Sequence, residues 1–123
     1  MAIKDVLILH SSAAETATGQ SADFGEFGSF SRALLVLNVT AVSGTTPSMT
    51  VKLQERSDQV TGGLYVDPAS GYAFSAVTAT GVSRLAIDWL YVVKYRAVWT
   101  ISGTTPSFTF SLVAYLSTEE PIP

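Results

Sequence analysis

The chain has a single histidine, His10, which is the residue best suited to acid–base catalysis or metal binding. A catalytic or metal-ligating histidine needs partners at a defined spacing, and no such motif surrounds His10. The absence of cysteine excludes disulfides, thiolate metal sites and cysteine nucleophiles. A serine nucleophile would have only His10 as its base, and the nucleophile-elbow motif does not occur. We therefore interpret His10 as a structural residue within an apolar strand.

Carboxylates and glycines give no stronger indication of chemistry. Asp58, Asp67 and Asp88 could bind calcium if they met in space, but the EF-hand pattern is absent and acids in such loops usually form turns. The glycines of segment 19–28 match neither the dinucleotide-binding nor the Walker pattern. The sequence thus predicts no enzymatic activity, no cofactor and no metal site.

Four aromatic residues, Trp89, Tyr91, Tyr95 and Trp99, lie close together in the sequence. Exposed on a sheet, they could stack on sugar rings, as in a carbohydrate-binding module. Tyr91, Tyr95 and Trp99 share the parity of the apolar residues between them, which favours packing in a core. Exposure of Trp89 or Trp99 would support sugar binding.

Composition bounds the class of protein. A length of 123 residues fits one domain, residues 1–123, and only 14% of the residues are charged, against roughly 25% in typical soluble domains. Such a chain has a surface rich in serine and threonine, or hides part of its surface against partners. A net charge of -3 with no basic run argues against nucleic-acid binding. No apolar stretch approaches the roughly 18 residues of a membrane span, so we expect no membrane partner.

Alternation of apolar and polar residues dominates the chain and predicts β-strands. It is clearest in segments 49–54, 91–101 and 108–114. Segment 32–42 begins instead with a nearly continuous apolar run, Ala33 to Leu37, which is typical of a strand covered on both faces. Shorter strands are expected at 6–10, 15–18, 72–77 and 84–89, with turns at 18–21, 43–48, 57–63 and 67–71; a short turn near 29–33 is the one helix candidate. The sequence predicts an all-β fold, a single-domain antiparallel β-sandwich that is jelly-roll-like.

One internal repeat stands out, because the letters SGTTPS occur at both 43–48 and 102–107, each between two strand patterns. Glycine gives a permissive φ and proline a fixed one, so the same turn chemistry could make two similar hairpin connections. Alternatively, the two loops lie at one end of the sandwich and touch a partner. In that case Thr45, Pro47, Thr104 and Pro106 are candidate contacts.

The two ends of the chain are candidate extensions. Residues 1–10 form an N-terminal arm or edge strand, whose apolar Ile3, Val6 and Ile8 could add to the sheet of a neighbouring subunit or pair within their own domain. The run from Val6 is too short for a signal peptide. Residues 117–123 are polar, acidic and end in proline, so we expect an extended C-terminal tail.

The strand-and-turn patterns resemble small structural proteins of tailed bacteriophages, among which capsid decoration (cement) proteins are the nearest. The likeness extends over residues 11–116 and is carried by three segments: SSAAETATG at 11–19, LNVTAVSGTTPSMTVKLQE at 37–55 and YRAVWTISGTTPSFTFS at 95–111. The resemblance implies a β-sandwich, often of jelly-roll type, and a trimer or other small oligomer on the outside of a head shell. Its motifs are tied to no contact residue.

These observations lead to one functional hypothesis and two alternatives. The hypothesis is a non-enzymatic head decoration protein that binds the major capsid protein, forms a homo-oligomer with the trimer favoured, and resides on the capsid exterior after assembly in the bacterial cytoplasm. The alternatives are a structural protein of the phage tail or neck, and a carbohydrate-binding β-sandwich module.

Overall fold

The computed structural model describes residues 3–22, 24, 30–56, 65–66, 72–87, 90 and 94–118. These residues form an all-β structure without helices, and every strand pairing is antiparallel. The strands are β1 (Asp5–Glu15), β2 (Gly19–Gln20), β3 (Arg32–Arg56), β4 (Tyr65–Val66), β5 (Gly81–Ile87) and β6 (Tyr95–Ser117). The all-β prediction is thereby confirmed. The predicted helical turn near 29–33 is wrong from Arg32 onward, where β3 begins.

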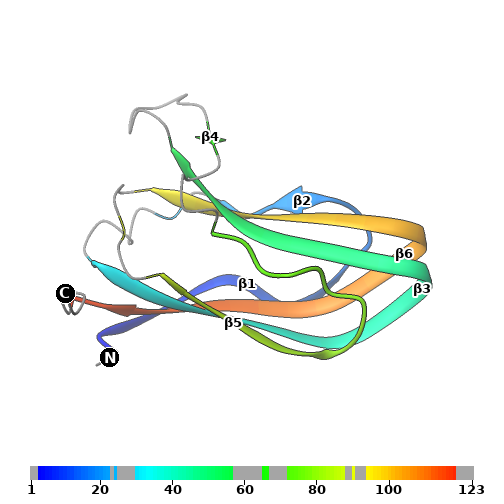
Figure 1. Cartoon of the computed structure of the whole chain (residues 1–123), viewed down its shortest axis with the longest axis horizontal. Coiled ribbons are helices and arrows are strands. Elements are labelled where there is room, and N and C mark those ends of the chain that lie inside the picture. Colours follow the sequence, from blue (N-terminus) through cyan, green and yellow to red (C-terminus); the bar gives the residue numbers. More distant parts are fainter. Residues whose placement is uncertain are drawn as a thin grey trace.

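Two unusually long strands, β3 and β6, form the centre of the sheet (Figure 1). They pair along their whole length, from Arg32 opposite Ser117 to Glu55 opposite Tyr95. Shorter strands line the two outer edges of this pair. β1 and then β2 follow the free edge of β6, while β4 and β5 follow the free edge of β3.

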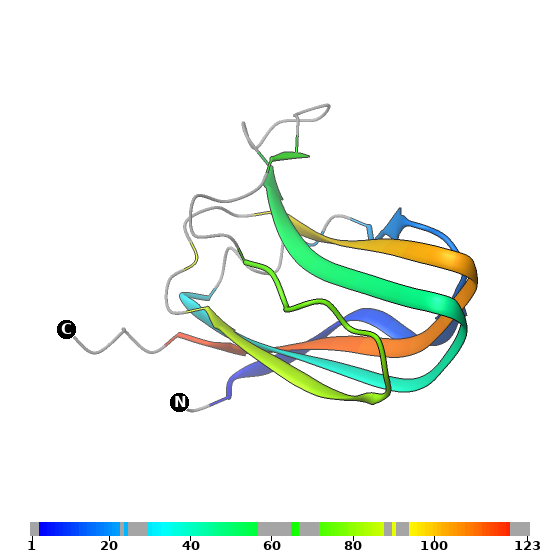
Figure 2. The same cartoon turned by 45° about the vertical axis from the view of Figure 1, so that its right-hand side comes forward.

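The long β3–β6 ribbon folds back on itself, so that one continuous sheet makes two layers (Figures 1 and 2). The first layer holds β1, the C-terminal half of β6, the N-terminal half of β3, and β5. The second layer holds β2, the N-terminal half of β6 and the C-terminal half of β3. Because side chains alternate along a strand, every second residue points between the layers. Phe108, Phe110 and Met49 are fully buried there, each worth roughly 1.5–3 kcal/mol relative to exposure.

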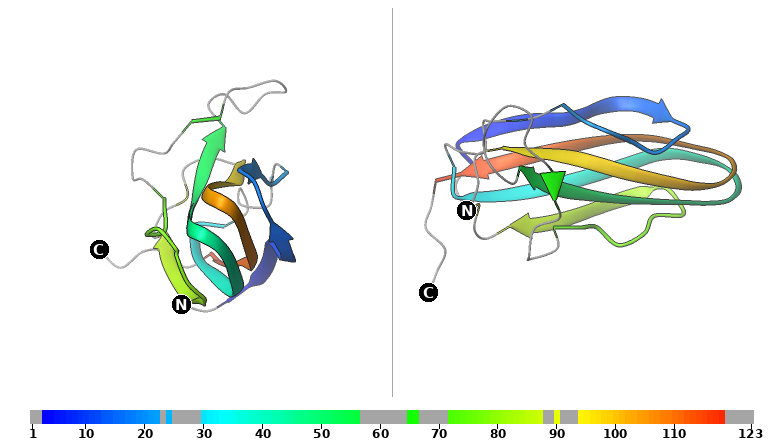
Figure 3. Two further views of the ribbon diagram at one scale, coloured as in Figure 1. Left: turned by 90° about the vertical axis from the view of Figure 1, so that its right-hand side faces the viewer. Right: turned by 90° about the horizontal axis from the view of Figure 1, so that it is seen from above.

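The two SGTTPS segments make the bend in the β3–β6 ribbon. The prediction that they are turns between separate strands, at 43–48 and 102–107, is wrong. Both segments stay within their strands, and Thr45 lies opposite Thr104. Positive φ values at Gly44 (110°) and Gly103 (121°) turn the two strands together. The repeat therefore makes one shared corner rather than two separate hairpins, as the end-on view in Figure 3 shows.

A local two-fold axis passes through this corner. Residues 59 positions apart take equivalent places, so Ser43 corresponds to Ser102 and Ser48 to Ser107. Ser43 pairs with Ser107, and the equivalent residues, Ser102 and Ser48, pair in the same way. A second repeat lies in similar places of the two halves, at an offset of 62 rather than 59. The letters TATG occur at 16–19 and 78–81, where one glycine pairs with β6 and the other with β3. The two halves of the chain thus contribute equivalent strands, each edge strand pairing with the other half's long strand.

Some predictions fall on residues outside those described. The turns predicted at 57–63 and 67–71 lie there, and so does the tail beyond residue 118. Of the predicted strand 91–101, the described part begins at residue 94 and alternates as expected, since Tyr95, Ala97 and Trp99 are buried. The jelly-roll order of strands is not established by this pairing and stays a prediction.

Candidate interaction surfaces

The N-terminal strand pairs within its own domain. β1 runs antiparallel to β6, with Asp5 opposite Leu116, and its register shifts beyond Ile8. Three apolar side chains of this end of the chain are nevertheless exposed: Ile3 by 47%, Val6 by 49% and Ile8 by 56%. The arm predicted for residues 1–10 is therefore an edge strand with an apolar, solvent-facing row.

Val6 and Ile8 belong to a larger apolar surface. Across the first layer, Val6 lies in one row with Tyr115 and Leu34, and Ile8 lies in the next outward row with Val113 and Val36. These rows alternate with the buried row that contains Leu35, so they point away from the core. We call this surface the apolar face, and it consists of Val6, Ile8, Leu34, Val36, Val113 and Tyr115.

The outward surface of the second layer has the opposite character. Its rows pair Thr50 with Thr100, Lys52 with Val98, and Gln54 with Arg96. Arg96 donates two hydrogen bonds to Oε1 of Gln54, at 3.0 Å from Nε and 2.8 Å from Nη2, and lies over the ring of Tyr65. We call this surface the polar face, and it consists of Thr50, Lys52, Gln54, Arg96, Val98 and Thr100, of which Val98 alone is apolar. Such polar side chains are typical of a sheet surface that faces solvent.

The corner brings four of the predicted contact residues together. Thr45 and Thr104 lie opposite each other and are exposed, while Pro47 and Pro106 are half-buried beside them. The neighbouring threonine hydroxyls are occupied locally, because that of Thr46 donates to the preceding carbonyl oxygen at 2.8 Å, as does its symmetry equivalent. The corner is an uncharged surface at one end of the molecule (Figure 1).

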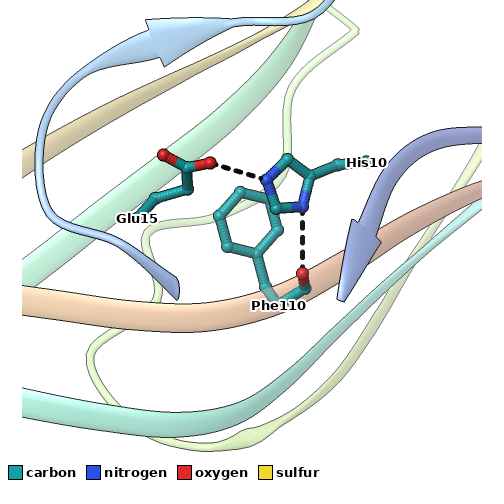
Figure 4. A network of polar contacts seen from close by, with 3 residues as sticks. All are labelled: His10, Glu15 and Phe110. Atoms are coloured by element: carbon teal, nitrogen blue, oxygen red, sulfur yellow. Dashed lines mark hydrogen bonds and ion pairs between the residues drawn. The ribbon is translucent and has the colours of Figure 1, made fainter. Parts of the chain in front are cut away.

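His10 lies where the register of β1 shifts, beside the ring of Phe110 and the carboxylate of Glu15 (Figure 4). Its ring stacks on Phe110 with centroids 4.0 Å apart and meets Trp99 edge-on. Nδ1 is 3.0 Å from the carbonyl oxygen of Phe110, and Nε2 is 3.0 Å from Oε1 of Glu15. A carbonyl only accepts, so Nδ1 carries a proton; the second contact then needs a further proton, either on Nε2 or on the carboxyl group.

The interpretation of His10 as a structural residue is consistent with this arrangement and stays a prediction. Nδ1 joins β1 to β6 through the carbonyl oxygen of Phe110, whereas Nε2 contacts Glu15 within β1 itself. Among the residues that the structure describes, no group of three histidines, cysteines or acids is placed to hold a metal ion. The acids Asp58, Asp67 and Asp88 lie outside the described residues.

The aromatic platform that sugar binding would need is absent from the described part of the aromatic cluster. Tyr95 is fully buried and Trp99 is 6% exposed, with the edge of its indole against Gly19. Trp89 and Tyr91 lie outside the described residues. Within the described residues, no helix is long and apolar enough to cross a membrane.

Comparison with known proteins found no match, whether to protein-family models, to curated proteins or to solved structures.

Sequence reasoning anticipated some of these surfaces and missed others. It found Val6 and Ile8, and the run Ala33 to Leu37 indicated that β3 would be covered on both faces. It did not predict that Val113 lies beside Val36 and Tyr115 beside Leu34, because that pairing needs the register between β3 and β6. The role of Glu15 was also missed, since the contact with His10 depends on the irregular pairing between them.

Proposed function

We propose that the chain is a non-enzymatic structural subunit of a phage virion, and that it serves as a head decoration protein on the capsid exterior. The observation that carries this proposal is the apolar face, because a sheet that leaves such a surface to solvent is suited to work against other protein subunits. The resemblance of segments 11–19, 37–55 and 95–111 to phage structural proteins supplies the virion setting.

The proposed partners are the major capsid protein and other copies of the chain, with a trimer the form that the resemblance implies. A jelly-roll sandwich is the corresponding expectation for the fold. The corner is a suitable contact for the shell, because Thr45 and Thr104 are exposed and the backbone there is held by paired strands. A cement protein needs such inert, preformed surfaces, since ordering a flexible one on binding would weaken the contact.

Sugar binding is less well supported by this structure. A carbohydrate-binding sheet presents aromatic rings to solvent, whereas the ring of Trp99 packs against His10 and Phe110 in the core.

Co-sedimentation with expanded, undecorated phage heads tests the proposal. We expect the protein to pellet with the heads and to raise their temperature of rupture. The Thr45→Lys/Thr104→Lys double variant should lose binding, because it places two charges on the uncharged corner. Thr50→Lys, on the polar face, is the matched control and should bind as the unmodified protein does. Heads of several tailed phages that neither bind nor gain stability would refute the proposal.

A further inference from the structure

We infer that the apolar face is covered by a second copy of this chain, packed sheet against sheet around a two-fold axis. The inference deepens the proposed function, on which it rests, by naming the partner of one surface. It predicts a dimer in solution, in place of the trimer that the resemblance implies. It is built from the comparison of two sheet faces within one molecule.

The apolar face departs from what its own symmetry equivalent shows. The two layers are made by the same two strands and are exchanged by the local two-fold axis at the corner. By the same offset of 59, Val113 corresponds to Gln54, and the cross-strand partners of these two residues are Val36 and Arg96. The first layer thus carries two valines where the second carries glutamine and arginine. Nearer the corner both layers carry polar pairs, Asn38 with Ser111 in the first and Thr50 with Thr100 in the second. The general needs of the fold cannot explain this difference, because both layers already bury their inner rows.

Exposed apolar side chains occur on both edge strands of the first layer. Val6 and Ile8 on β1 are about half exposed. Val82 on β5 is exposed by 50% and lies opposite the polar Asn38, in the row beyond the apolar face. Within the described residues, the apolar run of β3 is thus covered on its inner face alone, whereas its sequence is that of a strand covered on both. Sheets that pack face to face use such rows of valine, isoleucine and leucine.

Charge is compatible with self-association. The described part of this surface carries one charged side chain within its rows, Arg84, which lies on β5 opposite Val36. A two-fold axis parallel to the strands, between β6 and β3, would place β5 of one copy over β1 of the other. Arg84 would then face the exposed row of Ile8 rather than a second Arg84, so the contact brings no like charges together.

The size of the surface sets the strength of the contact. Four strands spaced about 4.8 Å apart, each contributing five residues at about 3.4 Å, project over roughly 320 Å². A standard stable interface buries about 800 Å² on each partner. The face alone therefore supports a weak dimer, which forms at high protein concentration or on a surface that concentrates the subunits.

Sedimentation equilibrium of the full chain tests the inference at loading concentrations from about 10 µM to about 1 mM, a range that brackets weak dissociation constants. We expect the average mass to rise reversibly from 13.0 kDa toward twice that value. Ile8→Lys should hold the mass at that of the monomer, and so should Val82→Lys, because both put a charge on the face. Both positions are exposed, so circular dichroism should show native folding.

Thr50→Lys, on the polar face, is the matched control and should dimerise like the unmodified chain. A mass that stays monomeric at every concentration would overturn the inference, as would a trimer that Ile8→Lys leaves intact, or equal behaviour of Ile8→Lys and Thr50→Lys. Failure here is distinguishable from failure of the proposed function, which is measured by co-sedimentation with phage heads.

Discussion

The corner glycines allow a quantitative test of how the ribbon folds. Gly44 has φ +110°, and a Cβ added there would lie 2.7 Å from the carbonyl oxygen of Thr105 and 2.8 Å from Cα of Pro106. Gly44→Ala therefore meets two obstacles. The left-handed backbone costs roughly 1–2 kcal/mol for an L-residue, and the close approach of two backbones adds about 1–3 kcal/mol of overpacking. We expect a loss of about 2–5 kcal/mol in the free energy of unfolding.

Gly81 supplies the matched control, because its φ is +153° but no atom lies within 4 Å of its added Cβ. Gly81→Ala should cost only the backbone term, roughly 1–2 kcal/mol. Gly103 faces the backbone of Thr46 and Pro47 in the same way as Gly44 faces its partners, so Gly103→Ala should match Gly44→Ala. The double variant should cost less than the sum, because one opening of the corner relieves both contacts.

Denaturant unfolding followed by circular dichroism measures these differences, with the slope of the transition checked for constancy. The reasoning would be refuted if Gly44→Ala cost no more than Gly81→Ala. It would also be refuted if Gly44→Ala and Gly103→Ala differed by as much as the predicted contact energy, since the two-fold axis makes the two sites equivalent.

Two further predictions concern the core beside β1. Glu15→Gln should lower the free energy of unfolding by less than about 1 kcal/mol, because an amide can donate to Nε2 of His10. Glu15→Ala should lower it by about 1–3 kcal/mol, because it removes the hydrogen bond. Thermal unfolding that ranks these two variants in the reverse order would contradict the assignment. In a Trp89→Phe variant, the fluorescence of Trp99 should be blue-shifted, poorly quenched by acrylamide and unchanged by polysaccharides, because its indole is buried; a red-shifted spectrum that polysaccharides alter would instead favour sugar binding.

Local patterns predicted most of the strands because alternation survives in each one separately. Tyr95, Ala97 and Trp99 face the core as their parity requires, and His10 lies in a strand as expected. The corner was misread, since glycine, threonine and proline in sequence usually indicate a chain reversal. Here each SGTTPS segment is paired with the other, so the strand continues through it. That pairing joins residues 59 positions apart and has no local signature.

The surfaces, like the strands, could be predicted from the sequence only in part. Exposure of Ile8 followed from its place in an edge strand. The apolar run of β3 predicts cover on both faces, whereas the described residues bury its inner face alone. Which residues complete the apolar face depends on the register between β3 and β6, which sets Val36 opposite Val113. A one-residue shift would have turned the buried row outward instead, so the surface is a property of the pairing rather than of any single strand.

The most direct test of the apolar face as a protein interface is a concentration series of amide spectra from the ¹⁵N-labelled chain. Dilution should shift the signals of Val6, Ile8, Val36 and Val113, and should leave those of Thr50, Lys52 and Arg96 unchanged. Shifts confined to the polar face, or spectra that do not change with concentration, would contradict the account.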